Sequence, residues 1–80
     1  MDELQTKCEV ERILMDRGYL IKIEEFQSLG DMGFDSIDII GLETDIETQL
    51  GLPNPNVKTG WLRDNDTIDT ILTKIKYWKP

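Results

Sequence analysis

Apolar residues repeat with the period of an α-helix in three stretches of this chain, and these stretches predict three main helices. The first covers about residues 3–17 and is expected to break at Gly18. Ile13 lies off its main apolar face, so we expect the buried surface to be broad or the helix to be slightly irregular. The residues that we expect on the buried face are Leu4, Cys8 and Met15, with Val10 and Leu14 on its flank.

The second helix is predicted from about Ser36 to Leu50. Asp35 is placed to cap its first backbone N–H groups, and Gly51 is expected to end it. The predicted buried stripe is Ile39, Leu42, Ile46 and Leu50. A different face carries Ile37, Ile40, Gly41, Thr44, Glu47 and Thr48. The two isoleucines of that face lie beside Ser36 and away from the core, as a docking surface requires.

A third helix is predicted over roughly residues 67–78, with Asp66 as its N-cap. Its apolar positions follow helical spacing at Ile68, Ile71, Leu72, Ile75 and Trp78. The connector before it, residues 51–65, is expected to hold a short helical turn near residues 56–62. The predicted fold class is therefore all-α, a small bundle of three main helices and one short helix.

Residues 18–34 are predicted to form a long ordered loop. Residues 19–23 are rich in strand-forming side chains, but the chain offers no convincing second strand to pair with them. We therefore expect this segment to pack as a loop. The side chains that we expect to fill part of the core from it are Leu20, Ile23, Phe26 and Leu29.

Length and charge limit the classes of function. Eighty residues make one domain, residues 1–80, with a small core. The formal net charge of -7 repels nucleic-acid phosphates and anionic membranes, and it attracts basic protein surfaces. The single cysteine, Cys8, cannot form an internal disulfide, and we expect it in the core rather than as a reactive thiol. The first eighteen residues are polar and charged throughout, so we expect no secretory signal and a cytoplasmic protein. A small acidic bundle gives no reason to expect more than a monomer.

One serine has the most informative surroundings in the chain. Ser36 lies between a glycine-containing turn and an amphipathic helix, and acidic residues flank it. The run from Leu29 to Asp38 resembles the signature of the acyl carrier protein family, in which an aspartate, a glycine and an Asp-Ser pair recur in fixed register. The matching positions are Asp31, Gly33, Asp35 and Ser36, with Ile37 in place of a leucine and Asp38 after it.

This resemblance implies the fold of an acyl carrier protein, whose first two helices are joined by a long packed loop. It also implies that Ser36 receives a 4′-phosphopantetheine arm from coenzyme A through a separate phosphopantetheinyl transferase. The thiol of that arm would hold acyl groups as thioesters. The chain has no histidine and no evident general base for its serine, so we expect a carrier and not an enzyme, with no metal site.

In this family the second helix is read by basic patches on partner enzymes that load and process the acyl group. The acids that crowd this helix are Asp35, Asp38, Glu43, Asp45 and Glu47. The partner-binding residues implied here are Ile37, Asp38, Ile40, Gly41, Thr44, Glu47 and Thr48. Gly41 and Thr48 depart from the acidic residues common in fatty-acid carriers. Gly41 is either tolerated drift or a point of close approach for a partner, and drift is slightly favoured.

Several alternatives stay open at this point. The cargo is a fatty acyl, polyketide, D-alanyl or other aminoacyl group, because these carriers share the signature. Phe34 is typical of polyketide-type carriers, but one aromatic residue decides little. Trp61 is expected to be a core or rim anchor, unless its segment covers an acyl chain. A second hypothesis is an unmodified helical interaction module derived from carriers.

Overall fold

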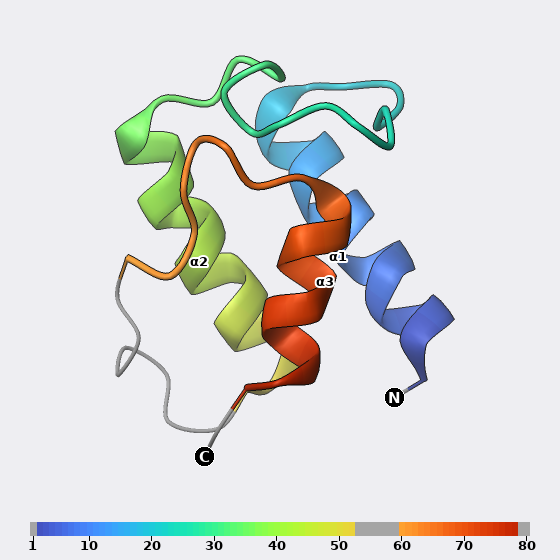
Figure 1. Cartoon of the computed structure of the whole chain (residues 1–80). Helices are drawn as coiled ribbons and strands as arrows, with labels where there is room; N and C mark the ends of the chain where they lie inside the picture. The colour runs from blue at the N-terminus through green and yellow to red at the C-terminus, as the bar shows by residue number, and fades with distance from the viewer. Residues whose placement is uncertain (1, 53–59, 79–80) are drawn as a thin grey trace.

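The computed structural model of this chain describes residues 2–52 and 60–78. Within these ranges it contains three α-helices and no strand (Figure 1). α1 spans Glu3–Gly18, α2 spans Ser36–Leu50 and α3 spans Ile68–Lys76. The prediction of an all-helical fold with three main helices is confirmed, and residues 19–23 form a loop as expected.

The predicted short helical turn near residues 56–62 falls mostly outside the described residues. The described part of the connector, residues 60–65, contains turns but no helix. Among the residues described, none of the helices is long and apolar enough to cross a bilayer.

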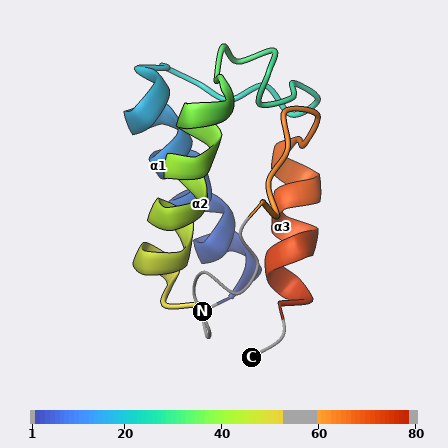
Figure 2. The ribbon, with the colours of Figure 1, turned by 90° about the vertical axis from the view of Figure 1, so that its left-hand side faces the viewer.

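The three helices pack as a small bundle in which α1 contacts both other helices (Figures 1 and 2). α2 and α3 both run in the direction opposite to α1. The loop between α1 and α2 crosses the end of the bundle where α2 begins, and the chain before α3 lies between α2 and α3. The described parts of both termini lie at the other end. The start of α2 is therefore presented at the loop-covered end of the molecule.

The buried face of α1 differs from the prediction. Val10, Ile13 and Leu14 are fully buried, whereas Leu4 and Cys8 are exposed, so the expected core cysteine is wrong. Helical spacing on α1 allows two apolar stripes. Packing against α2 and α3 buries the stripe that carries the branched side chains of Val10, Ile13 and Leu14. Gly18 does not break the helix. It is the last helical residue, and the chain turns instead at a left-handed Tyr19 with φ of 55°.

The buried stripe of α2 is confirmed, with Leu50 only half-buried. From the first loop, Leu29 is fully buried and Phe34 nearly so, while Leu20 and Ile23 pack against the core as half-buried side chains. Phe26 is exposed, and its predicted place in the core is wrong. Burial of this kind stabilises by roughly 1.5–3 kcal/mol per large apolar side chain, so two loop residues carry a sizeable part of a small core.

α3 begins one residue later and ends two residues earlier than predicted, and Thr67 is its N-cap in place of Asp66. The Thr67 hydroxyl accepts the backbone N–H of Thr70, and the Thr70 hydroxyl accepts the backbone N–H of Thr67. A reciprocal capping box of this kind satisfies two helix-end N–H groups.

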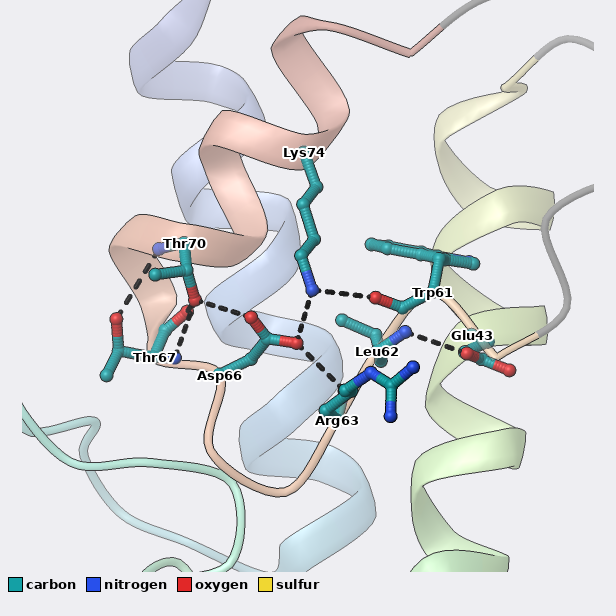
Figure 3. Close-up of polar contacts among 8 residues, drawn as sticks. All are labelled: Glu43, Trp61, Leu62, Arg63, Asp66, Thr67, Thr70 and Lys74. Carbon is teal, nitrogen blue, oxygen red and sulfur yellow. Dashed lines mark hydrogen bonds and ion pairs between the residues drawn. The ribbon is translucent and has the colours of Figure 1, made fainter.

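Asp66 is buried and organises the turn before α3 instead of capping it (Figure 3). Its carboxylate accepts the backbone N–H of Arg63 at 2.8 Å, the hydroxyl of Thr70 at 2.8 Å and the ammonium of Lys74 at 2.7 Å. Lys74 also donates to the backbone carbonyl of Trp61 at 2.8 Å. Asp66 and Lys74 therefore connect the segment before α3 with α3 itself.

Two glutamates of α2 hold the other side of the same segment. The buried carboxylate of Glu43 accepts the backbone N–H of Gly60 at 3.2 Å. It also accepts the backbone N–H of Leu62 at 2.8 Å (Figure 3). The carboxylate of Glu47 accepts the indole N–H of Trp61 at 3.2 Å. Trp61 also packs edge-to-face against Trp78, with ring centroids 5.1 Å apart, and so acts as a half-buried anchor.

Removing the Asp66 carboxylate is expected to destabilise the whole fold. Asp66→Ala leaves the Arg63 N–H without its partner and leaves the Lys74 ammonium with only the Trp61 carbonyl, so the free energy of unfolding should fall by about 2–3 kcal/mol. Asp64→Ala, on the same turn but exposed, should change it by less than about 0.5 kcal/mol. Urea unfolding followed by circular dichroism measures both, and equal losses would show that the buried carboxylate is not special.

Candidate functional site: the serine that begins α2

The chain that leads into α2 is a tight turn rather than a loose loop. The backbone N–H of Asp31 donates to the Ser28 hydroxyl at 3.1 Å, and the N–H of Ser28 donates to the Asp31 carboxylate at 3.4 Å. The N–H of Phe34 donates to the carbonyl of Leu29 at 3.1 Å. Gly33 has φ of 97°, which side chains with a Cβ rarely adopt. Asp31 and Gly33 therefore have structural roles in shaping this turn.

Two backbone hydrogen bonds fasten this turn to the segment before α3. The N–H of Leu29 donates to the carbonyl of Asp66 at 2.8 Å, and the N–H of Gly30 donates to the carbonyl of Asp64 at 2.8 Å. A Cβ on Gly30 would lie only 3.3 Å from the Asp64 carbonyl oxygen. The absence of a side chain at Gly30 thus lets the two loops approach, and α2 starts from a turn fixed on both sides.

Asp35 caps α2 as predicted. Its carboxylate accepts the backbone N–H of Asp38 at 2.9 Å, and the Asp38 carboxylate accepts the N–H of Asp35 at 3.2 Å. Both acids are thus occupied by backbone donors. Ser36 is the first residue of the helix; it is exposed, and its hydroxyl has no hydrogen-bond partner among the described residues.

The arrangement presents a nucleophile but no means of activating it. Ser36 has no histidine to act as base, since the chain contains none, and the neighbouring carboxylates are engaged in the capping box. An anionic group attached to Ser36 Oγ would lie at the positive end of the α2 dipole. Ser36 is exposed at this helix end, so a group attached to its hydroxyl would extend into solvent.

The expected partner face of α2 is exposed except at one position. Ile37, Ile40, Thr44 and Thr48 are exposed, and Asp38 and Gly41 are half-buried. The side chain of Glu47 is only 4% exposed, and its carboxylate accepts the indole N–H of Trp61. Its predicted place on the exposed face of α2 is therefore wrong. Its position follows from the chain between residues 60 and 62, which folds back over that side of α2 and needs an acceptor there.

Gly41 has a structural explanation that neither sequence hypothesis contained. The guanidinium of Arg17 lies across it: an added Cβ would meet Nη1 at 2.5 Å and Cζ at 2.7 Å. From this position Arg17 donates two hydrogen bonds to the Asp45 carboxylate, at 3.1 and 2.8 Å. The glycine gives α1 an arginine contact with α2.

A second arginine joins the same two helices. Arg12 donates from Nη2 to Glu9 and to the side-chain oxygen of Gln49, each at 2.6 Å. The hydrogen bond and charge of Glu9 raise the pKa of Arg12 further above its already high value. Polar contacts of Arg12 and Arg17 thus join α1 and α2 along the exposed side of their interface.

The acids of α2 are largely committed to the fold. Glu43 and Glu47 are buried acceptors for the segment before α3, and Asp45 binds Arg17. Sequence reasoning grouped these three with Asp35 and Asp38 as an acidic helix surface. No local pattern separates them, because their partners lie 14 to 28 residues away along the chain.

A cleft among the described residues lies away from Ser36. It has a volume of about 350 Å³ between α1 and α3 and contains the Lys76–Glu3 ion pair. Its lining residues are Glu3, Thr6, Leu72, Thr73, Ile75 and Lys76. The turn and helix residues around Ser36 take no part in it, so the candidate site is a projecting corner and not a pocket.

Comparisons with protein families, with curated proteins and with solved structures found no match to this chain.

Replacing the α2 cap should separate its structural role from its charge. Asp35→Ala removes the acceptor for the Asp38 N–H and is expected to lower the free energy of unfolding by about 1 kcal/mol. Asp35→Ser restores a capping oxygen without the charge and should recover most of the loss. Chemical denaturation measures both variants, and equal losses would contradict the capping role.

Substituting Gly41 tests the contact with Arg17. Alanine gains about 0.5–1 kcal/mol of helix propensity, but its Cβ displaces the guanidinium from Asp45. Gly41→Ala should therefore stabilise the protein more in an Arg17→Met background than in the wild type. An Arg12→Met background keeps the contact between Arg17 and Asp45 and serves as the control. In it, the effect of Gly41→Ala on stability should match that in the wild type. Additive effects of Gly41→Ala and Arg17→Met in denaturation experiments would refute this contact.

Proposed function

We propose that this protein is a discrete acyl carrier protein whose 4′-phosphopantetheine arm is attached to Ser36. The observation that carries the proposal is the position of Ser36. It is the exposed first residue of α2, it follows a turn fixed from two sides, and its hydroxyl has no hydrogen-bond partner among the described residues. The resemblance of residues 29–38 to the carrier signature points to the same residue. The three-helix bundle with a long first loop accords with that family.

Attachment of the arm is a phosphoryl transfer that the chain undergoes but does not catalyse. Ser36 Oγ attacks the pyrophosphate phosphorus of coenzyme A that bears pantetheine. The new Oγ–P bond replaces the P–O bond to the adenosine half, which leaves as adenosine 3′,5′-bisphosphate. A phosphopantetheinyl transferase supplies the base that takes the hydroxyl proton, since the carboxylates of Asp35 and Asp38 are occupied by backbone N–H groups.

The bound arm supplies a thiol that holds acyl groups as thioesters for enzymes of fatty acid, polyketide or related biosynthesis. The protein's own contribution is to hold the attachment point still and to keep it in solvent. Phe34 gives no indication of cargo, because its side chain is buried and packs toward Gly18. Aminoacyl carriers, including D-alanyl carriers, would use Ser36 in the same way.

The proposal predicts a covalent modification at one residue. Incubation with coenzyme A, magnesium and a broad-specificity phosphopantetheinyl transferase should add one phosphopantetheine, measured as intact mass. Ser36→Ala should show no gain. Thr73→Ala, which removes the hydroxyl of an exposed residue on α3, should retain the gain.

A lack of gain with several transferases would contradict the carrier function. It would favour an unmodified interaction module, which predicts that partner binding survives Ser36→Ala. Protein from its native cells that carries the arm in full would exclude that alternative.

A further inference from the structure

Three large apolar side chains project into solvent from the loop between α1 and α2. Tyr19, Ile21 and Phe26 are 96%, 99% and 86% exposed, and we call them the loop surface. Single exposed apolar residues are common, but three within eight residues on a domain with so small a core are unusual. This exposure contributes nothing to the stability of the isolated fold.

The outward direction of the loop surface is fixed by its neighbours. Leu20 and Ile23 alternate with it along the chain and pack against the core as half-buried side chains. The N–H of Leu20 also donates to the carbonyl of Met15 at 3.0 Å, which anchors the start of the loop to α1. The loop is thus held by its inner residues, and the outer ones are presented rather than left loose.

The loop surface lies at the same end of the bundle as Ser36. Both views show the loop crossing the end at which α2 begins (Figures 1 and 2). Exposed Ile37 and Ile40 flank Ser36 on α2. The loop surface and the α2 residues Ile37 and Ile40 therefore expose apolar groups at the same end of the bundle as the Ser36 hydroxyl.

The charge around this corner indicates the kind of partner. Between residues 19 and 38 the exposed charged side chains are four acids and one lysine, namely Glu24, Glu25, Asp31, Asp35 and Lys22. The lysine is paired with Glu24 at 3.0 Å. The complement to such a corner is a surface with apolar pockets bordered by lysine or arginine.

We propose that the loop surface is a docking site for the phosphopantetheinyl transferase that modifies Ser36, which contacts it through an apolar area with a basic border. This rests on the proposed carrier function and extends the expected docking face from α2 onto the first loop. The site serves recognition alone, since none of the three side chains has a role in the transfer reaction.

Initial rates of phosphopantetheinylation at varied carrier concentration test this. Ile21→Gln with Phe26→Gln should raise the KM for the carrier about tenfold, the effect of losing one important interface contact, and leave kcat unchanged. The control is Leu4→Gln with Tyr77→Gln, two residues that are 71% and 68% exposed on helix ends away from Ser36. The control should stay within about twofold of the wild type. Equal thermal midpoints establish that all variants are folded.

The outcomes separate the two proposals. Modification of the wild type with an unchanged KM in the loop variant would overturn the loop surface and leave the carrier function standing. An equal rise in KM in the control would also overturn it, because the effect would then follow loss of any exposed apolar group. A wild type that several transferases leave unmodified would overturn both.

Discussion

The fold depends on buried carboxylates that fasten residues 60–66 between α2 and α3. α2 and α3 each pack against α1, and the segment before α3 fills the space between them. Glu43 binds two N–H groups of that segment, and Asp66 gathers a backbone N–H, a hydroxyl and an ammonium. A buried carboxylate is costly unless its acceptor sites are filled. The sites of Glu43 are filled by donors 17 and 19 residues away, and those of Asp66 by donors three to eight residues away in the same turn and in α3. The acids thereby specify one path for this segment.

That path also sets the position of Ser36. The carbonyls of Asp64 and Asp66 accept hydrogen bonds from Gly30 and Leu29, so the turn before α2 rests on the segment that the carboxylates hold. Without this support the turn would depend on its own local bonds and on the burial of Leu29. An exposed residue of a small domain has a defined orientation only when the backbone that leads to it is held in place. The hydrogen bonds to Asp64 and Asp66 hold the backbone before Ser36 in this way.

Features whose causes lie within a few residues were predictable from the sequence. The bounds of α2, its cap at Asp35 and its end at Gly51 follow from local spacing and cap chemistry. The roles of Glu47, Asp66 and Cys8 were not predictable in this way. The role of Glu47 depends on where Trp61 returns to α2. Asp66 and Thr67 are both suitable capping residues, and local spacing does not decide between them. For Cys8, helical spacing on α1 allowed two apolar faces of similar quality. The candidate site could be predicted because its signature is contiguous in the sequence. The hydrogen bonds that fasten it to the turn before α3 could not, because they join segments that lie far apart in the sequence.

The commitment of α2 acids to the fold changes how a partner can recognise this protein. Glu43 and Glu47 are buried, and Asp45 is bound to Arg17, so the middle of α2 offers little free negative charge. The exposed acids that remain near Ser36 lie in the first loop and at the α2 cap. Attraction to a basic surface is therefore concentrated at one end of the bundle, and because screened charges act over about 8–10 Å, that end is where an encounter begins. Under the proposed carrier function, recognition and modification use the same end of the molecule.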